Sequence, residues 1–393
     1  MRVAIFTDTF LPEVNGVART LGRWTNYLES QGIACKVFAP SSEERSEVRR
    51  SETMVERFYS IPFLLYPECK LAIPNPLNIK RTLKEFKPTL IHVATPFNLG
   101  LYGVHYAKKH RIPLVASYHT HFDQYLAHYR LEWLEAMLWR YMLWFHQDCR
   151  KVYVPSHSTL THLQSKGFNT PLEIWGRGVD CSRFRPDVNQ AQVLAGFEAD
   201  PSKFTYLYVG RLAPEKSVSV LLDAFRQLPP EIAGRSQLLI AGDGPSYDEI
   251  AESLGESTQI KLLGFVQGQQ LADLYAASDV FVFPSATETF GNVVLESMAA
   301  GTPVIGAKAG GVQDNVLHNQ TGLLCPPGDV TAFRDAMVQL YRNAGQRLLM
   351  SAAGRAYAMQ QSWPSIFDRL LLSFRAAAEA DWSEVQQHQH LVK

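Results

Sequence analysis

The sequence lacks the features that mark membrane-spanning, secreted and nucleic-acid-binding proteins. No stretch reaches the roughly 18 consecutive apolar residues of a transmembrane helix, so no span is expected. The opening MRVAIF is followed at once by the polar residues TDT and is too short for a signal peptide. The 38 basic and 38 acidic residues cancel, which leaves no overall electrostatic attraction for nucleic acid. We expect a soluble cytoplasmic protein without a nucleic-acid partner, which can still touch a membrane from one side.

Motifs for metals and common cofactors are also missing. Asp-x-Asp, a usual carboxylate pair for holding a divalent cation on a diphosphate, occurs nowhere in the chain, and neither does a Walker A motif. Gly242 and Gly244 lack the third glycine of a dinucleotide-binding loop, which favours a strand-end turn. The cysteines are odd in number and form no CxxC pair, which favours buried reduced thiols over disulfides or zinc: Cys35, Cys69, Cys149, Cys181 and Cys325. We therefore expect no metal site and no cofactor.

Short runs of β-branched and aromatic residues recur along the chain, with helical patterns between them. The runs are apolar throughout rather than alternating, which is typical of parallel strands covered by helices on both faces. Six lie in the first half, at 2–6, 35–39, 90–94, 113–117, 151–155 and 172–175, and six in the second half, at 205–210, 237–242, 260–264, 279–283, 303–307 and 322–325. The sequence therefore predicts an α/β protein with two doubly wound, Rossmann-like parallel sheets.

The length and composition of the chain indicate where these sheets separate. A chain of 393 residues is too long for one ordinary core, so two domains are expected. The break falls in GRGVDCSRFRPDVNQAQ, which is rich in glycine, arginine, proline and aspartate. We place the domains at 1–185 and 186–355, and we expect helices over 356–393 to cross back to the first domain. Ligands of such sheets bind beyond the carboxyl ends of the strands, so the loops after the strands are the candidate sites.

Two glutamates flank a turn in the stretch PSATETFGNVVLESMAAGTPV. In one continuous helix Glu288 and Glu296 would lie about 80° apart around the axis and about 12 Å apart along it, too far to share a partner. The sequence instead predicts a loop to Phe290 and a helix from about Asn292, because Gly291 breaks the turn and good helix formers follow. Glu288 then hangs in the loop and Glu296 lies one turn into the helix, so both can border one cavity.

Two cations follow the first strand of the second half, in GRLAPEK. Arg211 leaves the strand, and Lys216 stands at the start of an amphipathic helix. Cations at a helix N-terminus oppose the helix dipole, so an anion from outside the chain is the economical explanation. A diphosphate fits, because arginine binds it through two hydrogen bonds and lysine as a point charge. A solvated pair without a ligand is the alternative.

The first domain offers two further candidates. In TDTFLPEVNGVARTL, Gly16 opens a helix whose N-terminal N–H groups suit a phosphate, although a simple strand-to-helix turn explains the same residues. In ASYHTHFDQY, His119 and His121 directly follow a strand and point to opposite faces, which is poor geometry for one metal. We expect His119 to be functional and His121 structural, with a core histidine as the alternative for His119.

Taken together, the motifs resemble a known enzyme family over nearly the whole chain. GRLAPEK, AGDGP, LADLYAASDVFVFPSATETFGNVVLESMAAGTPVI and AGGVQD resemble the C-terminal domain of the family 4 retaining glycosyltransferases, which have the GT-B fold. TDTFLPEVNGVARTL and ASYHTHFDQYL resemble their N-terminal domain. Within the family, residues 118–146 look most like the lipid glycosyltransferases of the sulfoquinovosyl-diacylglycerol and mannosyl-glycolipid kind. The resemblance implies two Rossmann-like domains that face a central cleft.

The resemblance also implies roles for the candidate residues. Glu288 would face the donor sugar near its anomeric carbon, and Glu296 would bind the nucleotide ribose. Arg211 and Lys216 would hold the diphosphate, with Gly16 as a backbone contact to the phosphates. His119 would contact the sugar or the leaving group. The turn between the glutamates would complete the donor site: Phe290, Gly291 and Asn292.

The segment 124–151 suggests a membrane contact. At helical spacing one apolar stripe is formed by Trp133, Met137, Tyr141 and Trp144, and it is widened by Leu134, Leu138 and Phe145. Four cations flank it: Arg130, Arg140, Arg150 and Lys151. Aromatic rings with edge cations are typical of an interfacial segment, whereas a buried core helix is the alternative. Both hold if the stripe is core and only the turns near 125–130 reach a bilayer.

We therefore expect a metal-independent hexosyltransferase that uses a nucleoside-diphosphate sugar, either UDP-glucose, UDP-galactose or GDP-mannose. Its acceptor would be a hydroxyl of a membrane lipid or glycolipid, reached by peripheral association with the inner face of the cell membrane. The alternatives are a sugar-nucleotide epimerase of the same fold and a transferase acting on a soluble sugar or metabolite. A non-enzymatic sugar-nucleotide sensor is a third alternative. The residue set argues against it, because such a sensor needs the cations but not the sugar-facing carboxylate of Glu288.

Overall fold

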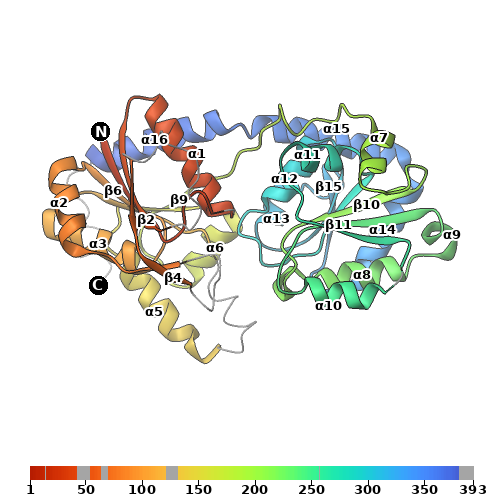
Figure 1. The fold of residues 1–393 in the computed structure, drawn as a ribbon, viewed down its shortest axis with the longest axis horizontal. Helices are drawn as coiled ribbons and strands as arrows, with labels where there is room; N and C mark the ends of the chain where they lie inside the picture. The colour runs from red at the N-terminus through yellow and green to blue at the C-terminus, as the bar shows by residue number, and fades with distance from the viewer. Residues whose placement is uncertain (14, 42–53, 63–69, 121–131, 256, 380–393) are drawn as a thin grey trace. The chain divides into compact units, whose positions relative to one another are not determined.

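The computed structural model describes residues 1–13, 15–41, 54–62, 70–120, 132–255 and 257–379. The chain divides into two units, which are described separately here: unit 1, Met1–Gly176 with Pro364–Lys393, and unit 2, Arg177–Trp363. The domain limits predicted from composition, 185/186 and 355/356, lie inside unit 2. Each unit contains one large parallel sheet with helices packed against it (Figure 1).

Unit 1 contains the following elements: β1 (Arg2–Phe6), α1 (Gly16–Ser30), β2 (Ala34–Pro40), β3 (Val55–Phe58), β4 (Ser60–Pro62), β5 (Lys70–Ala72), α2 (Pro76–Phe86), β6 (Leu90–Val93), α3 (Asn98–His110), β7 (Leu114–Ser117), the 3-10 helix η1 (Glu132–Leu134), α5 (Glu135–His146), β8 (Lys151–Val154), α6 (His157–Ser165), β9 (Leu172–Ile174) and the C-terminal α16 (Trp363–Glu379).

Unit 2 contains the following elements: α7 (Gln190–Gly196), β10 (Phe204–Val209), the 3-10 helix η2 (Pro214–Lys216), α8 (Val218–Arg226), α9 (Pro230–Ala233), β11 (Ser236–Ala241), α10 (Tyr247–Leu254), β12 (Ile260–Gly264), α11 (Gly268–Ala276), β13 (Val280–Phe283), α12 (Asn292–Ala299), β14 (Val304–Ala307), α13 (Gly310–Asn315), β15 (Gly322–Cys325), α14 (Val330–Arg342) and α15 (Ala344–Gln360).

Both large sheets are parallel and reverse their strand order at one point. The unit 1 sheet runs β3-β2-β1-β6-β7-β8-β9, and the unit 2 sheet runs β12-β11-β10-β13-β14-β15. The order reverses between β1 and β6 in unit 1 and between β10 and β13 in unit 2. In doubly wound sheets ligands bind at such a reversal point, beyond the carboxyl ends of the strands, so the loops after these strands are the candidate sites.

The predicted strands form because their residues are buried on both faces. All four residues from Val3 to Phe6 have no exposed surface, and every residue of β11 is buried. Each of the twelve predicted runs contains a strand, so the prediction of two doubly wound α/β domains is confirmed. The strand β3 was missed because Glu56 and Arg57 interrupt its apolar character.

The C-terminal helix α16 packs in unit 1, alongside α1 (Figure 1). Phe374 of α16 has no exposed surface and contacts the rings of Trp24, His92 and Tyr153 at centroid distances of 5.2, 5.4 and 5.2 Å. Ser373 accepts a hydrogen bond from Lys151 Nζ at 2.9 Å. A segment more than 180 residues from β9 along the chain thus completes the core of unit 1.

We predict that Phe374→Ala destabilises unit 1 by about 3–5 kcal/mol, because it empties a site lined by aromatic rings that cannot collapse fully. Chemical denaturation followed by tryptophan fluorescence checks this, since Trp24 lies directly against Phe374. Leu372→Ala on the same helix is the matched control, because that side chain is 65% exposed. Equal stability of the two variants would contradict the packing role of α16.

Candidate active site

Glu288 lies in the loop that joins β13 to α12 in unit 2. Helix α12 begins at Asn292, as predicted, and Glu296 follows one turn later. The hydroxyl of buried Tyr275 donates a hydrogen bond to Glu296 Oε2 at 3.4 Å. Burial raises the pKa of Tyr275, and the carboxylate of Glu296 raises it further, so the phenol stays a neutral donor.

Backbone contacts hold the Glu288 loop in place. Gly311 N donates to Glu288 O at 2.7 Å, and Asn315 Nδ2 donates to Phe290 O at 2.6 Å. On the other side, the Thr287 hydroxyl donates to Glu215 O at 3.2 Å. Because these bonds all use backbone oxygens, they fix the loop without using the Glu288 carboxylate.

Gly310 and Gly311 allow their own backbone to approach the Glu288 loop closely. A Cβ on Gly310 would lie 2.2 Å from Glu288 O, and a Cβ on Gly311 would lie 2.3 Å from Phe290 Cα. Real Cβ atoms do not come this near to backbone, so any side chain here would push the loop away. The two glycines of AGGVQD therefore determine the position of the Glu288 loop.

Arg211 and Lys216 are each bound to a glutamate of the chain. Arg211 pairs with Glu215, and Lys216 Nζ lies 2.6 Å from Glu288 Oε1. Two carboxylates of the chain thus already oppose these cations, and the expected binding of an external anion stays a prediction. The i,i+4 spacing of Arg211 and Glu215 was the signal in the sequence that could have revealed the first pair.

The carboxylates of these pairs lie close to one buried phenol. Tyr208 has no exposed surface and donates its hydroxyl to Arg211 O at 3.1 Å. Burial raises the pKa of Tyr208, and the charges of Glu288 and Glu215 raise it further. Arg211, Glu215, Lys216 and Glu288 thus form a cluster of alternating charge at the ends of β10 and β13. Such a cluster can rearrange around an incoming dianion, because the anion competes with the glutamates for the same cations.

The N-terminus of α12 borders the same loop. Gly291 has a φ of +80°, a left-handed conformation that favours glycine, and no side chain caps the helix. Asn292 Oδ1 is buried without a hydrogen-bond partner among the residues that the structure describes. Phe290 is 9% exposed and packs in the core of unit 2. The predicted donor-binding residues of unit 2 are therefore brought together around one loop.

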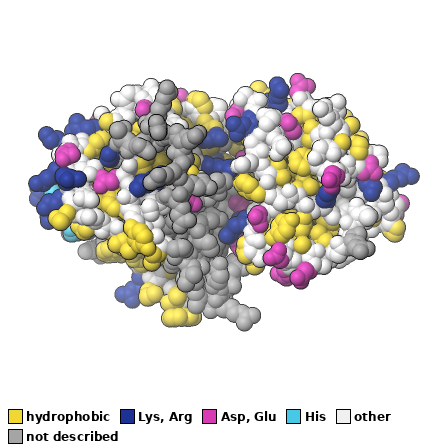
Figure 2. All heavy atoms as spheres, in the orientation of Figure 1, with side chains coloured by type: hydrophobic (Ala, Val, Ile, Leu, Met, Phe, Trp, Pro, Cys, Tyr) yellow, Lys and Arg dark blue, Asp and Glu magenta, His cyan; other side chains and the backbone are white. Residues whose placement is uncertain are grey.

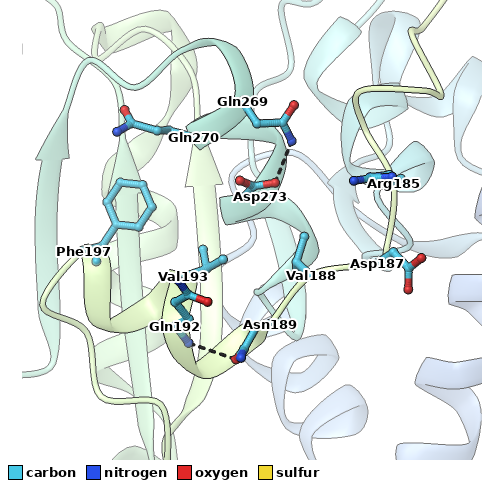
Figure 3. A pocket seen from close by; sticks show the side chains of 11 residues that line it. Arg185, Asp187, Val188, Asn189, Gln192, Val193, Phe197, Gln269, Gln270 and Asp273 are labelled. Carbon is cyan, nitrogen blue, oxygen red and sulfur yellow. Dashed lines mark hydrogen bonds between the residues drawn. The ribbon is translucent and has the colours of Figure 1, made fainter.

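A pocket of about 510 Å³ in unit 2 does not belong to this loop. It is lined by residues of the segment 185–197 and by Gln269, Gln270 and Asp273 of α11. Gln269 Nε2 donates to Asp273 Oδ1 at 2.7 Å within it (Figure 3). None of the predicted site residues lines this pocket, so the pocket is separate from the charged site at the Glu288 loop.

In unit 1, Gly16 is exposed and opens α1 after the loop that follows β1. Asn15 caps the helix by accepting from Ala18 N at 2.8 Å, and its amide donates to Thr9 Oγ1 at 2.7 Å. The cap fixes the direction of the first N–H groups of α1. This geometry fits both the phosphate contact and the simple turn that the sequence left open.

His119 follows β7 and is hydrogen-bonded within unit 1. Its Nε2 lies 2.9 Å from Ser117 Oγ, and Ser117 Oγ lies 2.9 Å from His92 Nε2. The ring of Trp175 meets His119 edge to face at 5.6 Å. His119 is partly exposed, whereas His92 has no exposed surface. His121 lies outside the described residues.

Sequence reasoning passed over Asp8, which lies just beyond the end of β1. Its Oδ2 accepts from Thr95 Oγ1 at 2.7 Å. Burial raises the pKa of Asp8 to about 7, against the lowering effect of the Thr95 hydroxyl and of nearby backbone N–H groups. Its Oδ1 has no partner of normal hydrogen-bond geometry in the described part of the chain. The polar triplet TDT directly after a buried strand was the available signal.

The 3-10 helix η1 and helix α5 expose most of the apolar stripe that was identified in the sequence. Trp133 is 76%, Met137 63% and Trp144 50% exposed. The core face consists instead of Trp139, Met142 and Phe145. The alternative in which this stripe is core is therefore contradicted, because α5 is apolar on two faces and only one packs on the sheet.

The cations that flank this stripe are mostly engaged elsewhere. Arg150 is buried and donates to Ala377 O at 2.5 Å, and Lys151 pairs with Glu173 at 2.6 Å. Arg140 is exposed on α5, whereas Arg130 lies outside the described residues.

Neither a membrane span nor a metal cluster is found in the described part of the chain. None of its helices is long and apolar enough to cross a bilayer. No three histidine, cysteine, aspartate or glutamate side chains of the described residues are grouped so that they could hold a metal ion.

Comparison with known proteins identifies the family. Residues 14–183 match Glycosyltransferase Family 4, and residues 203–343 match Glycosyl transferases group 1. A GDP-mannose-dependent alpha-mannosyltransferase of Mycobacterium tuberculosis (strain CDC 1551 / Oshkosh) is 32% identical over 380 residues, which cover 96% of this chain and 97% of that protein. The chain belongs to glycosyltransferase family 4. The resemblance drawn from GRLAPEK and the paired glutamates is confirmed, and so is the predicted class of hexosyltransferase.

Other relatives extend the comparison. The sulfoquinovosyl transferase SQD2 of Arabidopsis thaliana is 28% identical over 394 residues, or 98% of this chain and 76% of that one. The alpha-monoglucosyldiacylglycerol synthase of Streptococcus pneumoniae (strain ATCC BAA-255 / R6) is 28% identical over 315 residues, or 78% and 70%.

A solved structure supports the fold. The crystal structure of Anabaena Alr3699/HepE in complex with UDP superimposes with a TM-score of 0.77 at 21% identity, covering 96% of this chain and 100% of that one. The predicted fold class, GT-B with two Rossmann-like parallel-sheet domains, is confirmed.

For this glycosyltransferase we predict that Gly311→Ala lowers kcat on the order of 100-fold, because the new Cβ displaces the Glu288 loop from its place. A steady-state transfer assay measures the effect. Gly345→Ala in α15 is the matched control, since the nearest atom to its added Cβ is 3.7 Å away. Unchanged kcat in Gly311→Ala would show that the position of the loop does not matter for transfer.

Proposed function

We propose that the enzyme transfers a hexose from a nucleoside-diphosphate sugar to a hydroxyl of a membrane lipid or glycolipid, with retention of anomeric configuration. The observation that carries the proposal is the fixed Glu288 loop. Its carboxylate stands 2.6 Å from Lys216 Nζ, beside the Arg211–Glu215 pair and eight residues before Glu296. A binding module would need the cations but has no use for a carboxylate held among them.

The roles follow from the charges. We propose that the diphosphate draws Arg211 and Lys216 away from their glutamates and onto its oxygens, without a metal ion. Glu288, once released by Lys216, would face the hydroxyls of the sugar near its anomeric carbon. Glu296, already oriented by Tyr275, would accept from the ribose hydroxyls. The barrier falls through positioning and through stabilisation of the leaving diphosphate, whose phosphate oxygen accepts the proton of the incoming hydroxyl.

The remaining predicted contacts are part of the proposal. The N–H groups at Gly291 and Asn292, next to Phe290, would add hydrogen bonds to the diphosphate. In unit 1, Gly16 would offer backbone to a phosphate, and His119 would contact the sugar or the leaving group.

The names of the relatives support the choice of donor and acceptor. One is described as dependent on GDP-mannose, and another as a synthase of a glucosyl diacylglycerol. Both names describe transfer of a hexose, for which the charged loop offers a diphosphate site, and the second name adds a lipid product. UDP-glucose, UDP-galactose and GDP-mannose are therefore the donors to assay first.

The exposed apolar stripe on η1 and α5 supports a membrane contact. Trp133, Met137 and Trp144 leave apolar surface in water, and Figure 2 shows hydrophobic side chains gathered where α5 lies in Figure 1. Insertion at headgroup depth would bury these rings and bring unit 1 to its acceptor. Arg140 on the same helix would add attraction to anionic lipid.

We predict that Glu288→Gln lowers kcat on the order of 100-fold or more while nucleotide binding persists, because the carboxylate acts in the transition state. Glu296→Ala should mainly weaken donor binding. Both are measured by steady-state transfer and by thermal shift with UDP and GDP, run with and without EDTA.

A Glu288→Gln enzyme with most of its kcat would refute the assignment. Strict loss of activity in EDTA would refute the metal-free clamp. Conversion of the donor without any acceptor would favour an epimerase, and efficient transfer to a soluble sugar would favour the other alternative.

The membrane contact makes a separate prediction. Replacing Trp133, Met137 and Trp144 by serine should reduce binding to anionic vesicles about tenfold or more, because the apolar area available for insertion is lost. Co-sedimentation with phosphatidylglycerol vesicles at low and high salt measures it, and we expect salt to weaken the wild-type binding.

The matched control replaces Leu348 and Leu349 of α15 by serine, since these side chains are 72% and 75% exposed in unit 2. Equal losses in both variants would show that exposed apolar surface in general, and not α5, drives the binding. Absence of wild-type binding at low salt would contradict the membrane contact.

A further inference from the structure

A chain of three hydrogen-bonded side chains runs through the sheet of unit 1 to His119. His92 of β6 pairs in register with Val115 of β7, and Ser117 lies two residues further along that strand. Side chains two residues apart on a strand point to the same face, so Ser117 shares the face of His92. Both hydrogen bonds, from His92 Nε2 to Ser117 Oγ and from there to His119 Nε2, span 2.9 Å.

His92 lies in an apolar, aromatic environment. Its ring meets Phe374 edge to face at 5.4 Å and lies 6.0 Å from the ring of Trp175. Burial lowers the pKa of His92 to about 3, so its imidazole is neutral at physiological pH. An aliphatic or aromatic side chain would pack equally well there. Among the described residues, His92 forms its side-chain hydrogen bond with Ser117 through Nε2, and its Nδ1 has no hydrogen-bond partner there.

The donor and the acceptor of each of these two hydrogen bonds follow from counting the available protons. A neutral imidazole carries one N–H, and a buried N–H without a partner is rarer and costlier than a lone pair without one. His92 therefore carries its proton on Nε2 and donates it to Ser117. The serine hydroxyl has a single proton, which it then donates to His119 Nε2.

We propose that His92 and Ser117 are positioning residues that hold His119 as the neutral tautomer with its proton on Nδ1. The arrangement occupies Nε2 of His119 as an acceptor and disfavours an N–H there, because the proton of the buried Ser117 hydroxyl would then lose the acceptor that His119 provides. His119 thus presents an N–H rather than a cation. This deepens, and rests on, the proposed role of His119 at the sugar or the leaving group. A neutral donor there can bind an oxygen that gains charge without pairing permanently with a phosphate.

The tautomer can be observed directly. In protein labelled with 15N-histidine, long-range 1H–15N correlation distinguishes protonated from unprotonated ring nitrogens, with His119→Gln and His92→Gln used to assign the signals. We expect His119 to be protonated at Nδ1 and His92 at Nε2. In Ser117→Ala the His119 pattern should shift toward the Nε2–H or the doubly protonated form, and in Ser117→Thr, which keeps the hydroxyl, it should stay. A His119 protonated at Nε2 in the wild type would overturn the proposal.

Kinetics supply a second readout. Ser117→Ala should lower kcat roughly tenfold, the scale of one lost hydrogen bond, with the KM for the donor within about twofold. Ser117→Thr should restore kcat. His92→Phe, which keeps the ring shape but removes the donor, should behave like Ser117→Ala, and His92→Gln should restore part of the loss. Melting temperatures of all four variants identify any that fail to fold.

The two readouts separate this proposal from the role of His119. A tautomer that changes in Ser117→Ala without any change in kcat supports the hydrogen-bonded chain and refutes His119 as a contact in the reaction. A fall in kcat with an unchanged His119 tautomer overturns the chain and leaves the proposed function intact.

Discussion

Parallel pairing of the strands is the constraint on which every candidate site in this protein depends. Because all strands of a sheet run in one direction, their carboxyl ends meet at one edge, and the reversal of strand order at β1/β6 and β10/β13 opens that edge. Lys216 lies in the loop region after β10 and Glu288 follows β13, so residues 72 positions apart form an ion pair. The same constraint places Asp8 against Thr95 in unit 1, after β1 and β6.

The polar groups at these edges form ion pairs or hydrogen bonds with other groups of the same chain. Lys216 is bound to Glu288, Arg211 to Glu215, and His119 to Ser117. Half-buried charges need partners, so an empty site of opposite charges is stable only if the charges pair with each other. A ligand that binds there must replace those pairs by better ones. A diphosphate can do so because each of its oxygens carries charge and several accept hydrogen bonds at once.

Much of the fold and the positions of the charged loops follow from local sequence. The twelve strand runs are continuous and apolar, and a glycine before good helix formers predicts the start of α12 at Asn292. Partners could not be predicted in the same way. The contact of Gly311 with Glu288, the pairing of Lys216 with Glu288 and the alignment of His92 with Ser117 depend on which strands become neighbours. For α5, periodicity found one apolar stripe but not the second face with Trp139 and Met142, and it could not decide whether the stripe packs on the sheet.

The C-terminal helix links the stability of unit 1 to the chemistry at its edge. Phe374 of α16 packs on His92, and an apolar wall is what keeps that imidazole neutral and its Nε2–H directed at Ser117. Without the helix, water would reach Nδ1 of His92 and could accept a hydrogen bond there, so the neutral imidazole could carry its proton on Nδ1 instead of Nε2. Ser117 would then donate to His92 Nε2 and no longer to His119. A segment remote in the sequence from every strand-end loop thereby helps determine which proton His119 presents.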